Sequence, residues 1–194
     1  MSFLEFANDP IIRVSRRRFI GNGLLLSGAA VALLSGNEVL AADSKAGKSA
    51  RESDVRILNT ALGAELEAIA AYQVGAESGL LQKPVLDLAV TFQGHHKEHA
   101  DILRKTVEKL GGKPVAAKEK YTFPTDQLKS QADVLRFAAG LEKGAVSAYL
   151  GAVPILGSGD LAKAAASILG DEAMHWAVLR NALGEPPVPA AFVS

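Results

Sequence analysis

Several acidic and imidazole side chains occupy positions where an amphipathic helix would carry apolar residues. Glu65 shares a helical face with Leu62 and Ile69. Glu172 and His175 are three residues apart, so they point in the same direction from a helix. Such groups in a core repel one another or lack hydrogen-bond partners unless a cation lies among them. Their types and spacing therefore indicate a site for a divalent metal ion or a pair of ions. The residues that carry this prediction are Glu65, His99, Glu142, Glu172 and His175.

Four helical segments must position these residues. Apolar side chains recur at steps of three and four residues in each segment. Ser53 and Ser130 are the predicted N-caps of two helices, Pro84 suits the first turn of another, and Pro154 ends one. The predicted helices start at 53, 84, 131 and 159 and end near 75 or 79, 110, 153 and 183. No segment has the pattern of a strand, so the predicted fold class is all-α.

The connections between these helices are short, long and short. This order is typical of a four-helix bundle made of two helical hairpins joined by a crossover. About 20 extended residues reach ~65 Å, whereas a helix of about 27 residues is only ~40 Å long. The long connection can therefore cross the whole bundle. We expect it to bring the third helix back parallel to the first.

The two predicted hairpins also repeat in sequence. Shifts of 76 and 77 residues align rare residue types in the same order, which we interpret as duplication of a hairpin. The aligned pairs are Gly94 with Gly170, His99 with His175, Glu65 with Glu142 and Tyr72 with Tyr149. The repeated acidic and imidazole residues all lie about 18 to 22 Å from their hairpin turns. The duplication therefore places them at one level of the bundle.

On these residues the sequence resembles the ferritin-like superfamily, and within it the exported ferritin-like domain proteins related to plant desiccation-associated proteins. The resemblance covers residues 53 to about 183. It implies one ligand on each of the first and third helices, matched by Glu65 and Glu142, and a Glu-x-x-His motif on each of the other two. Glu172-Ala173-Met174-His175 matches that motif in full. The implied centre holds two iron or two manganese ions.

The second helix departs from this pattern, because His96 stands where the family has a bridging Glu before His99. A carboxylate can join two metals, whereas a neutral imidazole binds one metal through one nitrogen. The resemblance therefore implies six ligands, with His96 added, that suit iron, manganese or zinc. The centre is expected to be an asymmetric pair or to have one position empty. A network of buried ion pairs without metal is the alternative.

Neighbouring polar residues have simpler interpretations. His95 and Glu98 lie one residue from the ligand positions, a step of about 100° around a helix, so neither is expected to replace the missing carboxylate. Glu67 is expected on the surface. Tyr72 and Tyr149 are either hydrogen-bond partners of the ligands or core aromatic residues.

Composition excludes other classes of protein. The chain has 194 residues, with 21 Lys and Arg against 21 Asp and Glu, so it lacks the basic surplus of a general nucleic-acid binder. It has no Cys, which excludes thiolate metal sites and disulfides. No glycine-rich phosphate loop or nucleophile elbow is present.

The N-terminal region has the pattern of an export signal. Arg16, Arg17 and Arg18 precede an apolar stretch at 21–34, which is shorter than the ~20 residues of a membrane span. The arginine run resembles a twin-arginine signal, whose machinery exports folded proteins. We expect cleavage after Ala41, a linker at 42–52, and an extended Pro-rich tail at 185–194. The mature protein is expected outside the cytoplasm, in the periplasm or beyond, without a stable membrane span.

Two functions follow as hypotheses. One is an exported metal-dependent redox protein that binds iron or manganese and consumes peroxide or oxidises Fe(II). The other is a non-catalytic stress or envelope protein that uses the bundle as a scaffold, with a degenerate or structural metal site. The expected partners are metal ions and the twin-arginine export machinery, and the sequence leaves room for a homodimer.

Overall fold

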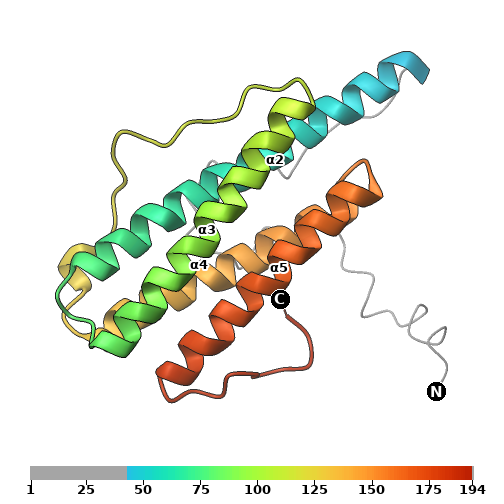
Figure 1. Ribbon diagram of the computed structural model, residues 1–194. Coiled ribbons are helices and arrows are strands. Elements are labelled where there is room, and N and C mark those ends of the chain that lie inside the picture. The colour runs from blue at the N-terminus through green and yellow to red at the C-terminus, as the bar shows by residue number, and fades with distance from the viewer. Residues whose placement is uncertain (1–42, 194) are drawn as a thin grey trace, which may run out of the picture.

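Long helices account for most of residues 43–193, the part of the chain that the computed structural model describes (Figure 1). The helices are α2 (Asp43–Glu77), α3 (Lys83–Lys109), η3 (Thr125–Gln127), α4 (Gln131–Ala152), η4 (Val153–Ile155) and α5 (Gly159–Ala182). The described residues contain no strand, as the all-α prediction requires. The predicted export signal and its cleavage site lie outside the described residues.

Local sequence signals explain where most of these helices begin and end. Ser130 caps α4, since its side-chain oxygen accepts a hydrogen bond from the backbone N–H of Asp133 at 3.3 Å. Pro84 occupies the first turn of α3, where its missing N–H has no helical partner to lose. Gly111 and Gly184 follow α3 and α5 with φ angles of 78° and 74°, a conformation that favours glycine.

The predicted start of the first long helix at Ser53 is wrong. Helix α2 begins at Asp43, so residues 43–52 are helical and do not form an extended linker. The exposed residues 47–52 include alanine, lysine, arginine and glutamate, which are good helix formers. A serine that could cap the N-terminus of a helix, such as Ser53, does not begin a new helix when the residues before it are also helical. Figure 1 shows this end of α2 extending beyond the other helices.

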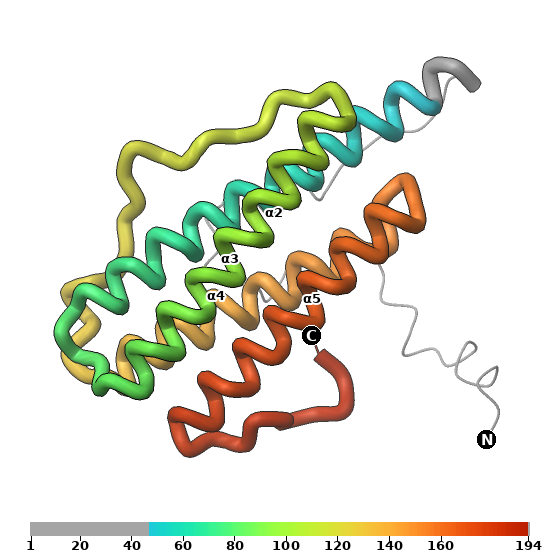
Figure 2. The backbone as a smooth tube through the Cα atoms, viewed as in Figure 1, coloured from blue at the N-terminus to red at the C-terminus, as the bar shows by residue number. Residues whose placement is uncertain are grey.

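The predicted direction of the third long helix is also wrong, because α4 runs antiparallel to α2. The backbone N–H of Gln82, in the turn between α2 and α3, donates to the side chain of Gln131 at the start of α4. At the other end, the backbone N–H of Gly157 donates to Asp54 near the start of α2. Figure 2 shows the reason: the long connection leaves the end of α3 and returns to the end of the bundle where α3 began. Helix α4 therefore runs in the direction of α3.

The core consists of two apolar clusters with a polar layer between them. The first cluster contains Leu58, Leu62, Ala100, Leu103, Val107, Tyr149, Ala165 and Ile168. The second contains Tyr72, Phe92, Leu135, Ala139 and Leu179. Along α2, Glu65 comes between Leu62 of the first cluster and Tyr72 of the second. The buried acidic side chains thus lie midway along the bundle, where both clusters exclude water from them.

Residues 185–193 continue past α5 without a helix, and most of them form bends. Arg180 holds the start of this segment, because its Nε donates to the carbonyl of Pro186 at 2.8 Å and its guanidinium lies 3.0 Å from Glu185. Among the described residues, none of the helices has both the length and the apolar composition of a membrane span.

Candidate metal centre

All six predicted ligands meet in the polar layer between the two apolar clusters. Helices α2 and α4 each contribute one glutamate, Glu65 and Glu142, and helices α3 and α5 contribute the rest. Five of the six are buried, and the His99 side chain is only 13% exposed. The residues form two groups of four that share His96 and Glu172, each with ligand atoms within 4.8 Å of one another. The structure therefore brings together every residue of the predicted site, and their binding of a metal stays a prediction.

The first ligand group is formed by His96, Glu142, Glu172 and His175. Three of its buried atoms have no hydrogen-bond partner among the described residues: Oε2 of Glu142, Oε2 of Glu172 and Nδ1 of His175. These atoms face one another, because Nδ1 lies 3.6 Å from the Glu142 oxygen and 3.7 Å from the Glu172 oxygen. Buried polar atoms without partners are rare and costly. Two carboxylate oxygens and one imidazole nitrogen in this arrangement fit a divalent cation.

The second ligand group is formed by Glu65, His96, His99 and Glu172. The Nδ1 atom of His99 lies 3.1 Å from Oε1 of Glu172 and 3.7 Å from Oε2 of Glu65. Glu172 gives Oε1 to this group and Oε2 to the first. Its carboxylate would therefore be able to hold a metal ion in each group.

His96 faces both groups at once. Its Nδ1 lies 2.8 Å from Glu65 and its Nε2 lies 3.3 Å from Glu142. A protonated ring donates one hydrogen bond to each carboxylate, whereas a nitrogen that has lost its proton can bind a metal on its own side. The side chain at this position thus contacts both ligand groups, as a glutamate there could, although it cannot supply the same negative charge.

Two buried tyrosines connect the hairpins by donating to these glutamates. Tyr149 donates to Glu65 at 2.6 Å, and Tyr72 donates to Glu142. Burial, together with the negative charge of these glutamates, raises the pKa of both phenols well above 10, so they remain protonated donors. The tyrosines are therefore both core residues and hydrogen-bond partners of the predicted ligands.

The carboxylates control the protonation of the imidazoles. Burial alone would lower the pKa of each histidine, but hydrogen bonds to the glutamates outweigh it and raise the pKa of His96 to about 10. The same balance raises the pKa of His99 and of His175 to about 9. Burial would raise the pKa of Glu142, but its contacts with His175 and His96 hold it well below its usual range. Without metal, the layer therefore carries imidazolium groups among carboxylates.

This pattern predicts how the stability of the metal-free protein depends on pH. The folded-state pKa values of about 9 to 10 lie above the ordinary value of 6.5. Their stabilising effect is complete below pH 6.5 and is lost as the pH rises through 9 to 10. We expect the free energy of unfolding to fall by at least several kcal/mol between pH 6.5 and 9.5, since each of the three pKa values is raised by more than 2 and a pKa difference of one corresponds to about 1.4 kcal/mol.

Urea unfolding of the chelator-treated protein at these two pH values measures the change. The His99→Asn variant is the control, because it lacks one of the three imidazoles and should show a smaller difference. An unfolding free energy that is constant or rises with pH would contradict the prediction.

Asp171 and His95 are part of the site although the sequence analysis did not select them as ligands. Oδ2 of Asp171 lies 3.1 Å from His95 Nδ1, 3.3 Å from His99 Nε2 and 3.2 Å from His175 Nε2. The expectation that His95 does not take the place of the missing bridge holds, because it lies at the outer edge of the layer. One signal could have revealed the pair: the shift of 76 residues aligns His95 with Asp171.

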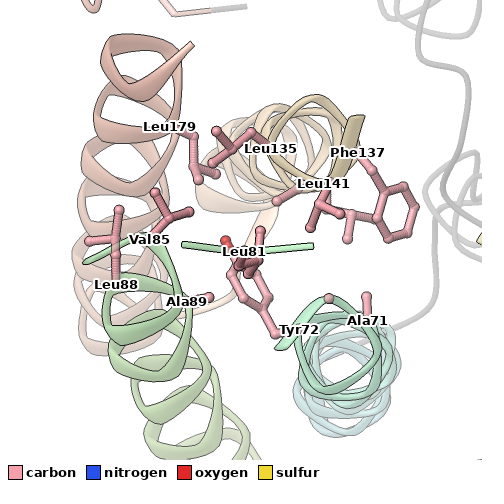
Figure 3. A pocket seen from close by; sticks show the side chains of 13 residues that line it. Ala71, Tyr72, Leu81, Val85, Leu88, Ala89, Leu135, Phe137, Leu141 and Leu179 are labelled. Carbon is pink, nitrogen blue, oxygen red and sulfur yellow. The ribbon is translucent and has the colours of Figure 1, made fainter. Parts of the chain in front are cut away.

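An apolar pocket borders the centre near the turn between α2 and α3 (Figure 3). Side chains from all four long helices line it, including Ala71, Val85, Leu135 and Leu179, together with Leu81 of the turn, and none of the lining residues is charged. Tyr72 forms part of its wall and also donates to Glu142. The pocket supplies no metal-binding group of its own, so the polar chemistry in this part of the bundle is confined to the layer.

Two helical hairpins around a buried layer of carboxylates and imidazoles define the class of ferritin-like bundle proteins. The model of the ferritin-like domain family matches residues 53–185. The chain therefore belongs to the ferritin-like domain family. It is similar to the crystal structure of a conserved hypothetical protein, rv2844, from Mycobacterium tuberculosis, with 26% identity and a TM-score of 0.63 over 75% of this chain and 98% of that chain. No curated protein matches the chain.

Proposed function

We propose that this protein is an exported ferritin-like protein that binds iron or manganese in the central layer and uses the metal in a redox reaction with peroxide or Fe(II). The observation that carries the proposal is the set of three unpartnered buried atoms on Glu142, Glu172 and His175. Carboxylate and imidazole ligands without thiolate suit iron and manganese, and zinc fits the same donors. A bound iron or manganese ion would supply the one-electron chemistry.

The chain's own residues hold and orient the ligands. Tyr149 and Tyr72 donate to Glu65 and Glu142, which leaves the second oxygen of each carboxylate directed into the layer. His96 holds a proton between the two carboxylates when no metal is bound. The two apolar clusters keep bulk water away from the layer. Export of the folded protein by the twin-arginine route would allow metal to be inserted before transport; the arginine run at 16–18 supports this part of the proposal.

The second candidate function is a non-catalytic scaffold in stress or in the cell envelope. One observation favours it: a protonated His96 can donate to one oxygen of Glu65 and one oxygen of Glu142 at once without any metal. The duplicated bundle would then be stabilised by buried ion pairs, with a degenerate or structural metal site. A folded protein that binds no metal excludes the first candidate, and a bound metal that reacts with neither peroxide nor Fe(II) favours the second.

Reconstitution of the metal-free protein with Fe(II), Mn(II) or Zn(II) is the test. We expect at least one bound ion per chain by elemental analysis, and a rise in the free energy of unfolding of about 2.7 kcal/mol when free metal is at about 100 times its Kd. A protein that stays folded, holds almost no metal after reconstitution with each of the three ions and gains no stability would support the scaffold instead.

A further inference from the structure

We propose that His95, Asp171 and His175 form a second cation site, open to solvent, on the outer side of the buried centre. Its ligand is a divalent first-row transition metal ion. The site shares the His175 ring with the centre proposed above, but it uses Nε2 of that ring, whereas the buried centre uses Nδ1. We call these three residues the outer triad.

The distances within the outer triad match those between ligands of one metal ion. His95 Nδ1 lies 2.9 Å from His175 Nε2 and 3.1 Å from Asp171 Oδ2, and His175 Nε2 lies 3.2 Å from the same oxygen. Neighbouring ligands of an octahedral ion with bonds of about 2.1 Å are about 3 Å apart. Two imidazoles and one carboxylate on one face of an ion form an arrangement used by non-haem iron, with the opposite positions open.

Hydrogen bonds within the outer triad cannot join all three atoms at once, although His99 Nε2, 3.3 Å away, can also donate to Asp171. Each imidazole nitrogen carries at most one proton, and that proton points along only one edge of the triangle. If both nitrogens donate to Asp171, two N–H groups face each other across 2.9 Å. If one nitrogen donates to the other, it no longer donates to the carboxylate. A cation to one side of the triangle's plane, with bonds of about 2.1 Å, is in contact with all three atoms at once.

The outer triad is exposed to solvent on one side, and on the other side its His175 ring is packed against Phe92. The side chains of His95 and Asp171 are 41% and 22% exposed, whereas that of His175 is 2% exposed. Phe92 stacks on the His175 ring with centroids 4.0 Å apart, which fixes the ring with Nε2 facing the outer triad and Nδ1 facing the buried centre. Water can therefore fill the open positions of an ion at the outer triad but not the buried side.

The position of the outer triad also follows from the duplication. His95 and Asp171 occupy equivalent positions on α3 and α5, each directly before the residue that corresponds to the family's bridging glutamate. Because the two helices face each other at the layer, equivalent residues come together. The differing residue types give one imidazole and one carboxylate, which is a better pair of metal ligands than two like charges.

The test is a titration of the metal-free full chain with Co(II) alone, followed by calorimetry and by the visible absorption of bound Co(II). We expect two classes of site in the wild-type protein. The His95→Ala variant should lose one class, with the affinity of that class at least about tenfold lower, since loss of even an orienting partner costs about that much. His95 is partly exposed, so the variant is expected to fold, and circular dichroism verifies this.

Glu98→Gln is the matched control, because Glu98 is exposed on the same helix and makes no hydrogen bond or ion pair with the outer triad among the described residues. It should bind Co(II) as the wild type does. Unchanged Co(II) stoichiometry and affinity in His95→Ala would overturn the outer site. Failure of the buried centre has a different signature: Glu172→Gln would then match the wild type, while His95→Ala would still lose an ion.

Discussion

Replacing Glu172 with glutamine is expected to lower the affinity of the central layer for Fe(II) or Mn(II) by more than about 100-fold. Loss of a residue that only orients a ligand already costs about 10- to 100-fold in metal affinity. Glu172 would be a ligand itself, and to both ion positions, since Oε1 lies 3.1 Å from His99 and Oε2 lies 3.7 Å from His175. Glutamine has nearly the same shape, so the loss of charge and of one oxygen is tested without leaving a cavity.

Glu67→Gln is the control for this substitution. Glu67 is on the same bundle but points away from the layer, where its 21% exposed side chain lies 3.7 Å from Lys118. The same change of charge at this position should leave the metal content unaltered. Elemental analysis and a Mn(II) titration of the three proteins measure the effect. Equal metal affinity in Glu172→Gln and in the wild type would rule out a centre that Glu172 bridges.

The sequence alone was sufficient for the class of fold and for the level of the site. Apolar periodicity and the signals at Pro84 and Ser130 located the helices, because both depend on residues close together in the chain. The duplication then placed Glu65, His99, Glu142 and His175 at one depth, and the structure brings these residues together. Depth along a helix is fixed by a rise of about 1.5 Å per residue, so this part of the geometry is local arithmetic.

Properties that depend on neighbouring helices could not be predicted from the sequence. Periodicity contains no information about direction, so the antiparallel course of α4 relative to α2 was missed. A step of about 100° from a ligand position was the reason not to expect His95 in place of the missing carboxylate, and this rule considers one helix alone. Asp171 shows why that rule fails: at the seam between two helices, a residue one step from a ligand position still reaches the neighbouring helix, where it contacts His95 and His99.

The substitution of His96 by glutamate is expected to raise the capacity of the buried centre from about one ion to about two, because it corrects the charge of the layer. Glu65, Glu142 and Glu172 are the only carboxylates among the six predicted ligands. Two divalent ions would leave the layer with a net positive charge, away from water, and such a charge is costly to bury. A fourth carboxylate in contact with both ion positions balances two divalent ions. Like Glu172, the new carboxylate would be able to contact both ions. A two-metal site can stabilise charge on both sides of a reacting molecule.

His96→Gln separates the effect of charge from that of removing the imidazole, since glutamine has the shape of glutamate without its charge. Anaerobic reconstitution with Fe(II) followed by elemental analysis gives the stoichiometry, and stopped-flow absorbance after mixing with oxygen gives the oxidation rate. We expect the extra ion and faster Fe(II) oxidation in His96→Glu alone. The outer triad does not contain His96, so these substitutions should not change the ion that it binds. Adding His95→Ala to the wild type and to each His96 variant, and measuring bound iron again, gives the contribution of the outer triad. If both variants bind the same amount of iron, charge does not limit the centre, and the shape of the layer must set its capacity instead.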